Sequence, residues 1–272
     1  MTIDPVWGWA VLLGVLGLVF GSFIATLAIR WPAGKVITSG RSACDVCAKG
    51  LQAGELIPVL SYLLQRGRCR GCGAPIRVQH VLTEMVGGAI GIAAAIASPD
   101  PAGAAGAVFG WLLLTLAALD IEALWLPNKL TATLAIAGLA TGFMGLQPAL
   151  QDRLIGGAAG FGVLWIVAWS YRRLRGRQGL GGGDPKLFGG IGLWLGWQAL
   201  PLVLLAACLI GLAGVLGLML GGRRITATDR LPFGVMLAAA AFAVWLGQAI
   251  NPPPPSADIV TTLNDRIYGE DR

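Results

Sequence analysis

Eight long apolar stretches constrain the fold of this 272-residue chain more than any other feature of its sequence. A helix of about 20 apolar residues is long enough to cross the hydrocarbon core of a bilayer. Charged residues make up 12% of the chain, against about 25% in soluble domains, and the mean hydropathy is +0.72. These values argue against a soluble, disordered or nucleic-acid-binding protein and predict an all-α polytopic membrane protein with about eight transmembrane helices. The stretches cover residues 6–29, 81–98, 102–119, 129–147, 153–171, 186–197, 199–220 and 232–249.

The first and sixth stretches differ in character from the others. The sixth, residues 186–197, is short and rich in glycine, so we expect it to form a half-buried helix. The first is not expected to be a secretory signal, because no Lys or Arg precedes Arg30 and such signals begin with positive charge. It is expected to remain as a membrane anchor.

Positive charges are unevenly shared between the two sides that eight crossings would create. The segments 30–80, 120–129, 172–186 and 221–231 would fall on one side, and they hold 17 of the 20 Lys and Arg residues. Since Lys and Arg collect in cytoplasmic loops, we expect these segments in the cytosol and both chain ends outside it. The proline-rich end, residues 251–272, is expected to form an extended extracytoplasmic tail.

Four cysteines lie in the largest of these polar segments. Cys44 and Cys47 form one C-x-x-C pair, and Cys69 and Cys72 form a second pair after 21 intervening residues. Two such pairs at this separation are typical of a structural zinc site, in which four thiolates surround one tetrahedral ion. A loop of about 50 residues with few large apolar side chains would depend on that ion for much of its folding free energy.

Two other interpretations of the cysteines stay open. Thiol–disulfide exchange uses the same motif, although such pairs usually act on the oxidising side of a membrane and the charge distribution places these in the cytosol. The second interpretation is a tetracysteine loop that binds no metal. The fifth cysteine, Cys208, lies within an apolar stretch, where we expect it to pack without taking part in chemistry.

Ionisable residues at membrane depth are costly and are therefore candidates for function. The single histidine, His80, cannot form a two-histidine zinc-protease motif, and at a predicted helix entrance it is expected to be interfacial. Three carboxylates remain, Glu84, Asp120 and Asp184. Asp120 ends the third stretch and Asp184 precedes the sixth, so both are expected at the cytoplasmic boundary. Two carboxyl groups that share a proton there could activate a water for attack on a peptide bond.

The surroundings of Asp184 also permit a structural interpretation. Asp184 could pair with Lys186 or cap the helix that follows it. The glycines before it, Gly181 to Gly183, would allow an extended peptide to approach the backbone closely and would permit positive φ angles. A short Gly-x-Gly-Asp pattern does not separate these possibilities.

Further motifs occur in the order found in one family of membrane proteases. In chain order they are Gly21–Phe23, Arg30–Pro32, the first C-x-x-C pair, Glu55–Leu63, Arg66–Cys69 with Cys72, Gly73–Ile76, Glu84, Asp120, Pro127–Thr131, Gly181–Leu187 and Leu231–Gly234. With these motifs, over residues 18 to 250, the chain resembles the type IV prepilin peptidases, which are GxGD aspartyl proteases of the bacterial inner membrane.

The resemblance implies an activity and a place for it. It implies that the chain cleaves the short basic leader from type IV prepilins or from pseudopilins of type II secretion, at the cytoplasmic face of the inner membrane. The positions that match the catalytic aspartates of the family are Asp120 and Asp184.

Family members with a tetracysteine loop typically also methylate the new N-terminal residue, with S-adenosylmethionine as the donor. Glu84 is the candidate residue for this step, and its structural alternative is a bridge to Arg30 or Arg77. The chain departs from the family pattern at Ala25 and Asn128, where asparagine and aspartate are usual.

The sequence therefore predicts four segments and two kinds of partner. The partners are a prepilin or pseudopilin substrate and the lipid bilayer, with no nucleic acid. The alternative function is a membrane scaffold or ion transporter that carries a zinc loop and has no peptidase activity. The segments are a first transmembrane helix (1–30), a cytoplasmic tetracysteine zinc-binding domain (31–79), a transmembrane aspartyl peptidase core (80–250) and a polar extracytoplasmic tail (251–272).

Overall fold

The computed structural model describes residues 5–34, 43–44, 46–177, 179–222 and 231–252. Within these ranges the chain is helical and forms no β-strand, only two isolated bridges in the cysteine loop. Most of the predicted tail and part of the predicted zinc domain, residues 35–42 and 45, lie outside the described residues. The helices are α1 (Pro5–Arg30), η1 (Ala53–Glu55), α2 (Leu60–Leu64), α3 (Val78–Ala97), α4 (Pro101–Ala123), α5 (Asn128–Phe143), α6 (Leu150–Arg175), α7 (Asp184–Leu195), η2 (Trp197–Ala199), α8 (Leu200–Leu220) and α9 (Phe233–Ile250).

The prediction of a helical membrane protein is confirmed, and each of the eight apolar stretches forms a helix. The number of eight crossings is not confirmed, because six helices of the described chain are long and apolar enough to span a membrane. The two others, α5 and α7, have 16 and 12 residues. At 1.5 Å per residue they extend over about 24 Å and about 18 Å, less than the hydrocarbon core of about 30 Å.

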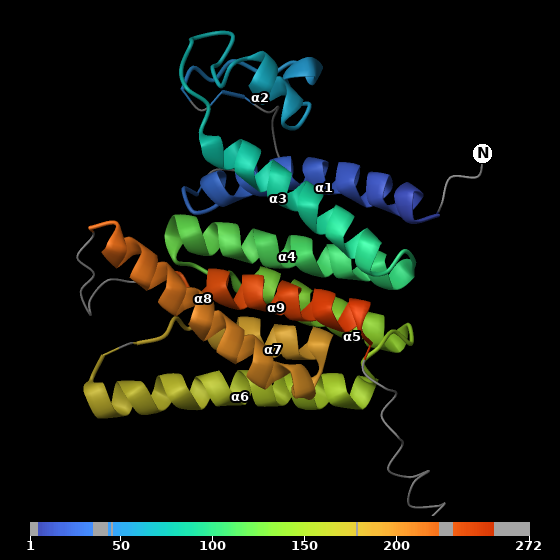
Figure 1. The fold of residues 1–272 in the computed structure, drawn as a ribbon. Coiled ribbons are helices and arrows are strands. Elements are labelled where there is room, and N and C mark those ends of the chain that lie inside the picture. Colours follow the sequence, from blue (N-terminus) through green and yellow to red (C-terminus); the bar gives the residue numbers. More distant parts are fainter. Residues whose placement is uncertain (1–4, 35–42, 45, 178, 223–230, 253–272) are drawn as a thin grey trace, which may run out of the picture.

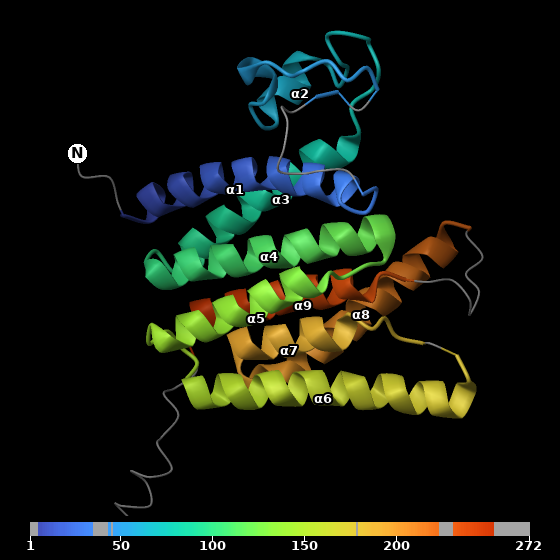
Figure 2. The same ribbon diagram turned by 180° about the vertical axis from the view of Figure 1, so that it is seen from behind.

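Successive long helices alternate in direction and lie side by side (Figures 1 and 2). The stack begins with α1 and α3, continues through α4 to α9, α5 and α7, and ends with α6. The cysteine loop with α2 lies beside α1 and α3, at the edge of the stack that is farthest from α6 (Figure 1). Because of the alternation, the end of α4 and the starts of α7 and α9 meet at the same end of the bundle.

Glycines allow α1 and α3 to pack backbone against backbone. A β-carbon at Gly17 would lie 2.1 Å from the carbonyl oxygen of Gly87, and one at Gly91 would lie 2.0 Å from that of Leu13. Small residues at a helix interface permit this close approach in membranes. The contact joins the first helix, which precedes the cysteine loop, to the helix that follows it.

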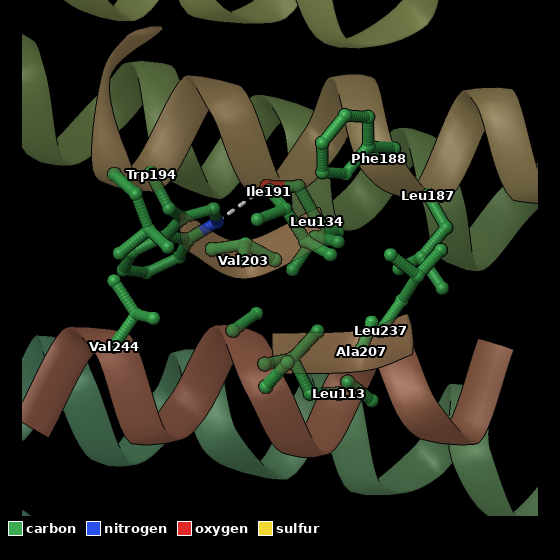
Figure 3. Close-up of a cluster of buried hydrophobic side chains, with 14 of the residues drawn as sticks. Leu113, Leu134, Leu187, Phe188, Ile191, Trp194, Val203, Ala207, Leu237 and Val244 are labelled. Carbon is green, nitrogen blue, oxygen red and sulfur yellow. Dashed lines mark hydrogen bonds between the residues drawn. The ribbon is translucent and has the colours of Figure 1, made fainter. Parts of the chain in front are cut away.

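α7 is buried along almost its whole length, more deeply than the half-buried helix expected, because α5, α6, α8 and α9 surround it. Figure 3 shows side chains of α7, α5, α8 and α9 interdigitating in this core. The Trp194 indole N–H donates a 2.8 Å hydrogen bond to the carbonyl oxygen of Leu134. Its ring stacks on Phe109 of α4, with 4.8 Å between the ring centroids.

Arg153 fixes the C-terminal end of α7. Its side chain is 1% exposed, and its guanidinium donates hydrogen bonds to six backbone carbonyl oxygens at 2.8 to 3.2 Å. A cation is favourable at the carbonyl end of a helix. Arg153 therefore joins the last turn of α7 to α5 and to the turn between α5 and α6. The acceptors are Gly138, Leu146, Gln147, Pro148, Leu193 and Trp194.

Candidate functional site

Asp120 lies in the last complete turn of α4 and is 5% exposed. The helix ends at Ala123, and the residue that caps it, Leu124, has a left-handed φ of 48°. The backbone N–H groups of Gly234 and Val235, at the start of α9, face the Asp120 carboxyl group. Its Oδ2 is nevertheless buried and has no hydrogen-bond partner among the described residues. A buried polar atom without a partner is costly, so this oxygen is available to bind a polar group.

Asp184 is the first residue of α7 and is also 5% exposed. Its Oδ2 accepts a 2.9 Å hydrogen bond from the backbone N–H of Gly181. Lys186, which the sequence suggested as a partner of Asp184, donates instead to Oδ1 of Asn128 at 2.6 Å. The carboxyl group of Asp184 therefore turns back toward the glycines that precede it, and Lys186 joins α7 to α5.

The two aspartates converge at one end of the bundle. Asp120 is close enough to Asp184 to act on it electrostatically. A β-carbon at Gly183 would lie 2.5 Å from Cβ of Leu126, and one at Gly234 would lie 2.8 Å from Oδ2 of Asp120 and 3.2 Å from Cδ1 of Leu126. Glycine at these two positions thus lets α7 and α9 approach the end of α4, with Leu126 between them.

The glycines before Asp184 act by close approach and not by positive φ. None of Gly181, Gly182 and Gly183 has a positive φ, so the structure does not use the positive φ angles that these glycines would permit. A β-carbon at Gly181 would lie 2.9 Å from Oδ2 of Asp184, which is the atom that its N–H binds. A β-carbon at Gly182 would meet nothing within 4 Å, so the backbone there is open to approach.

The four cysteines predicted to bind a metal form one cluster. Their sulfur atoms all lie within 4.8 Å of one another, and Sγ of Cys44 is 3.9 Å from Sγ of Cys72. Zinc–sulfur bonds of about 2.3 Å in a tetrahedron place neighbouring sulfurs about 3.8 Å apart. The cluster therefore fits a four-thiolate zinc site. Hydrogen bonds from the backbone N–H groups of Cys72 and Gly71 lower the pKa of the Cys69 thiol to about 6, whereas the neighbouring cysteine side chains contribute to a pKa of about 11 for Cys72.

The described residues of the two C-x-x-C segments share two backbone hydrogen bonds and a left-handed residue. In each, the N–H of the first cysteine donates to the carbonyl five residues later, and its carbonyl accepts from the N–H four residues later. The residue after the second cysteine is left-handed in both, Ala48 with φ 56° and Gly73 with φ 71°. This shared turn directs both sulfurs of each pair toward one point.

Glu84 lies away from the aspartates, in the first turns of α3. Its side chain is 7% exposed, and its Oε2 accepts a 2.7 Å hydrogen bond from the backbone N–H of Val59. Arg77 forms an ion pair with Glu122, whose Oε2 is 3.9 Å from Nη1 of Arg77. Glu84 and the half-buried His80 line a cavity of about 350 Å³ between α3, α1 and the cysteine loop.

Three residues that shape these sites were not given a role from the sequence. Leu126 is one leucine among many, and only its place between the two aspartate segments distinguishes it. Gly234 belongs to a motif, but its contact with Asp120 depends on how α9 packs against α4. Arg153 stood out only as a basic residue on the side of the membrane that was predicted to be poor in them.

Comparison with known proteins agrees with this arrangement. Residues 15–98 match the bacterial peptidase A24 N-terminal domain, and residues 107–216 match the type IV leader peptidase family. No solved structure matches the chain.

Three relatives are each named prepilin leader peptidase/N-methyltransferase. The protein of Burkholderia pseudomallei strain K96243 is 40% identical over 257 residues, which cover 84% of this chain and 82% of that protein. That of Aeromonas hydrophila is 40% identical over 76% of this chain and 71% of its own length. That of Pectobacterium carotovorum subsp. carotovorum is 34% identical over 86% of this chain and 91% of its own length. The resemblance found in the sequence motifs is therefore confirmed, and the chain belongs to the type IV leader peptidase family.

Proposed function

We propose that this protein cleaves the basic leader from type IV prepilins or type II secretion pseudopilins and then methylates the new N-terminus. The names of its relatives support both activities. We place the peptidase site at Asp120 and Asp184, at the cytoplasmic face of the bacterial inner membrane. The observation that carries this assignment is the convergence of two buried carboxyl groups, one of which has an unpartnered oxygen.

Two neighbouring carboxyl groups suit the hydrolysis of a peptide bond. The ionised member accepts a proton from a water molecule as that water attacks the scissile carbonyl carbon. The protonated member donates a hydrogen bond to the carbonyl oxygen, and its proton later reaches the leaving amine. The open backbone at Gly182 provides an edge along which an extended peptide could lie beside Asp184.

We further propose that Cys44, Cys47, Cys69 and Cys72 hold a structural zinc ion that stabilises the loop at 31–79. The cluster geometry supports this role over thiol–disulfide exchange. The helix ends that border the four basic segments lie at one end of the bundle, so the charge distribution supports a cytoplasmic position for the aspartates and the cysteine loop.

A cleavage assay tests the peptidase assignment. Purified protein in detergent is incubated with a prepilin, and Asp120→Asn and Asp184→Asn are compared with the unchanged protein. We expect each substitution to abolish cleavage without unfolding the helices. Asp152→Asn is the matched control, because Asp152 accepts a hydrogen bond from the Trp197 indole at the other end of the bundle. A scaffold or transporter would cleave no prepilin in any form, and retained cleavage by Asp184→Asn would refute the assignment.

A further inference from the structure

The short helix α2 carries an apolar face that the described chain leaves exposed. Leu60, Leu63 and Leu64 share this face, because residues three and four apart lie on one side of a helix. Their exposed fractions are 49%, 63% and 65%. Ser61 and Tyr62 lie on the other side of α2, where they line the cavity beside the cysteine loop. A cluster of exposed leucines on a small loop domain indicates a contact with an apolar partner.

The start of α2 is held at the depth of a membrane-spanning helix. α3 has 20 residues and is therefore about 30 Å long, which equals the thickness of the hydrocarbon core. Glu84 lies two turns into this helix, so its Cα is about 9 Å below the end that begins at Val78. Its carboxylate accepts the 2.7 Å hydrogen bond from Val59, the residue that precedes α2. Because long side chains lean toward the start of their helix, Val59 lies at a depth of about 5 to 9 Å.

The chain that follows α2 returns to the surface of the same leaflet. The carbonyl oxygen of Gly67 accepts a 2.8 Å hydrogen bond from the N–H of Ile76. Ile76 directly precedes Arg77, which caps the start of α3. α2 therefore lies between the apolar layer, where Val59 is held, and the boundary with water. Figures 1 and 2 agree with this placement, since the loop lies beside α1 and α3 and not beyond their ends.

The charged residues next to α2 suit this depth. Arg66 and Arg68 lie on either side of Gly67, and both are exposed. Arginines at the boundary attract the phosphate groups of anionic lipids, whereas the three leucines lie deeper. Apolar side chains on one face and cations beside them are typical of a helix that lies in the membrane interface. The charge of this segment is therefore complementary to that of a lipid surface.

The apolar face of α2 also continues the lipid-facing surface of the bundle. The segment before α2 and Gly21 of α1 cover Glu84, which is 7% exposed. A carboxylate at membrane depth is costly unless it is covered in this way. Next to Glu84, the first half of α3 presents exposed apolar side chains, so α2 lies beside a surface that contacts lipid. These side chains are Leu82, Met85 and Val86.

We propose that α2 is inserted into the leaflet that borders this end of the bundle. Leu60, Leu63 and Leu64 lie among the acyl chains, and Arg66 and Arg68 lie among the headgroups. The proposed orientation makes this the cytoplasmic leaflet. The cysteine loop is then a domain of the membrane interface, anchored to lipid by its own helix as well as by α1 and α3. This inference goes beyond the proposed enzymatic activities and does not depend on them.

Site-specific photo-cross-linking of the full-length protein in nanodiscs tests this proposal. The nanodiscs contain phosphatidylethanolamine and phosphatidylglycerol. Benzoylphenylalanine, which reacts with nearby C–H bonds on illumination, replaces Leu63 or, in a second protein, Leu60. Mass spectrometry measures the yield of acyl-chain adducts. We expect a yield at least about tenfold higher than from the same label at Arg70, an exposed residue of the second C-x-x-C segment, and close to the yield from Leu82 of α3.

The arginines are tested with the label kept at position 63. Replacing phosphatidylethanolamine-only nanodiscs by ones with equal parts of phosphatidylglycerol should raise the adduct yield by about twofold, and Arg66→Gln combined with Arg68→Gln should remove this increase. Metal analysis of each labelled protein shows that the loop still binds zinc as the unlabelled protein does.

Two results would overturn the insertion of α2. Yields at positions 60 and 63 as low as that at position 70 would mean that the helix lies in water. Adducts to a pilin or to a second copy of the chain, in place of lipid adducts, would mean that the apolar face binds protein. Either result would leave the peptidase and methyltransferase proposals standing, because neither activity enters this measurement.

Discussion

Substitution of Gly234 by alanine would displace the candidate catalytic carboxyl group while leaving the fold intact. The new methyl group would lie 2.8 Å from Oδ2 of Asp120, whereas ordinary contacts begin at 3.4 Å. The carboxyl group must therefore move by about 0.6 Å, because Leu126 blocks the other side at 3.2 Å. A misplacement of 1 Å in a catalytic group can cost about 10²-fold in rate. We expect leader cleavage to fall by about 10- to 100-fold, or about 1.4 to 2.7 kcal/mol in the activation free energy.

Stability should change little in the same variant. Alanine is favoured over glycine within a helix by up to about 1 kcal/mol, which offsets the strain at the tip of the Asp120 side chain. Initial rates of prepilin cleavage and the thermal unfolding midpoint are measured for Gly234→Ala and for Gly247→Ala. Gly247 lies in the same helix, and a β-carbon there would meet nothing within 4 Å.

Equal rates of prepilin cleavage by Gly234→Ala and Gly247→Ala would contradict the proposed role of the Asp120 carboxyl group. In that case the Asp120 carboxyl group would either tolerate the displacement or take no part in cleavage. A large fall in the unfolding midpoint of Gly234→Ala alone would also contradict the packing argument, because it would mean that the contact with Leu126 cannot relax.

Three further substitutions test the elements that support the sites. Arg153→Met removes the donors to six buried carbonyl oxygens, so thermal unfolding should show a loss of at least about 3 kcal/mol. Ala48→Gly relieves a left-handed backbone and should stabilise the cysteine loop by about 1 kcal/mol, measured as slower transfer of zinc to a chelator. Cys44→Ser should release zinc, measured by metal analysis, while circular dichroism shows that the helices remain.

Each of these variants has a control in the chain. Arg172→Met replaces an exposed arginine of the same helix and should leave the unfolding midpoint unchanged; a similar loss in both would disprove the role of Arg153. Gly73→Ala creates the strained backbone in the second knuckle and should speed zinc loss, so no change there would contradict the strain argument. Cys208→Ser should retain zinc, and unfolding of the helices in Cys44→Ser would show that the bundle depends on the loop.

The positions of the helices and of the cysteine cluster could be predicted from the sequence, because they depend on local patterns. The way in which the helices pack against one another could not. Apolar length located all eight helices of the membrane region, and the spacing of Cys44, Cys47, Cys69 and Cys72 identified residues that the structure brings together. The count of eight crossings was not confirmed, because apolar composition located α5 and α7 but did not reveal that they have only 16 and 12 residues. The burial of α7 was also not predicted, since it depends on the helices that pack around it.

The hydrogen-bond partners of the polar side chains at the sites could also not be predicted from neighbouring residues in the sequence. Lys186 lies two residues from Asp184 but binds Asn128, which is 58 positions away in the chain. Glu84 binds the backbone of Val59 and not a side chain, so no pairing rule between charged residues could identify the contact. In both cases the partner is decided by which helix ends meet.

The short length of α7 has a consequence for how the aspartates are held. At its far end the carbonyl oxygens of Leu193 and Trp194 are bound by Arg153, and at its near end Asp184 is tied to Gly181. A slide by one turn, about 5.4 Å, would break all of these hydrogen bonds and the tight packing against α6. α7 therefore cannot adjust its depth to meet a substrate. In the proposed peptidase mechanism, the scissile bond would be brought to a fixed pair of carboxyl groups, and such preorganisation would make the two buried acids effective.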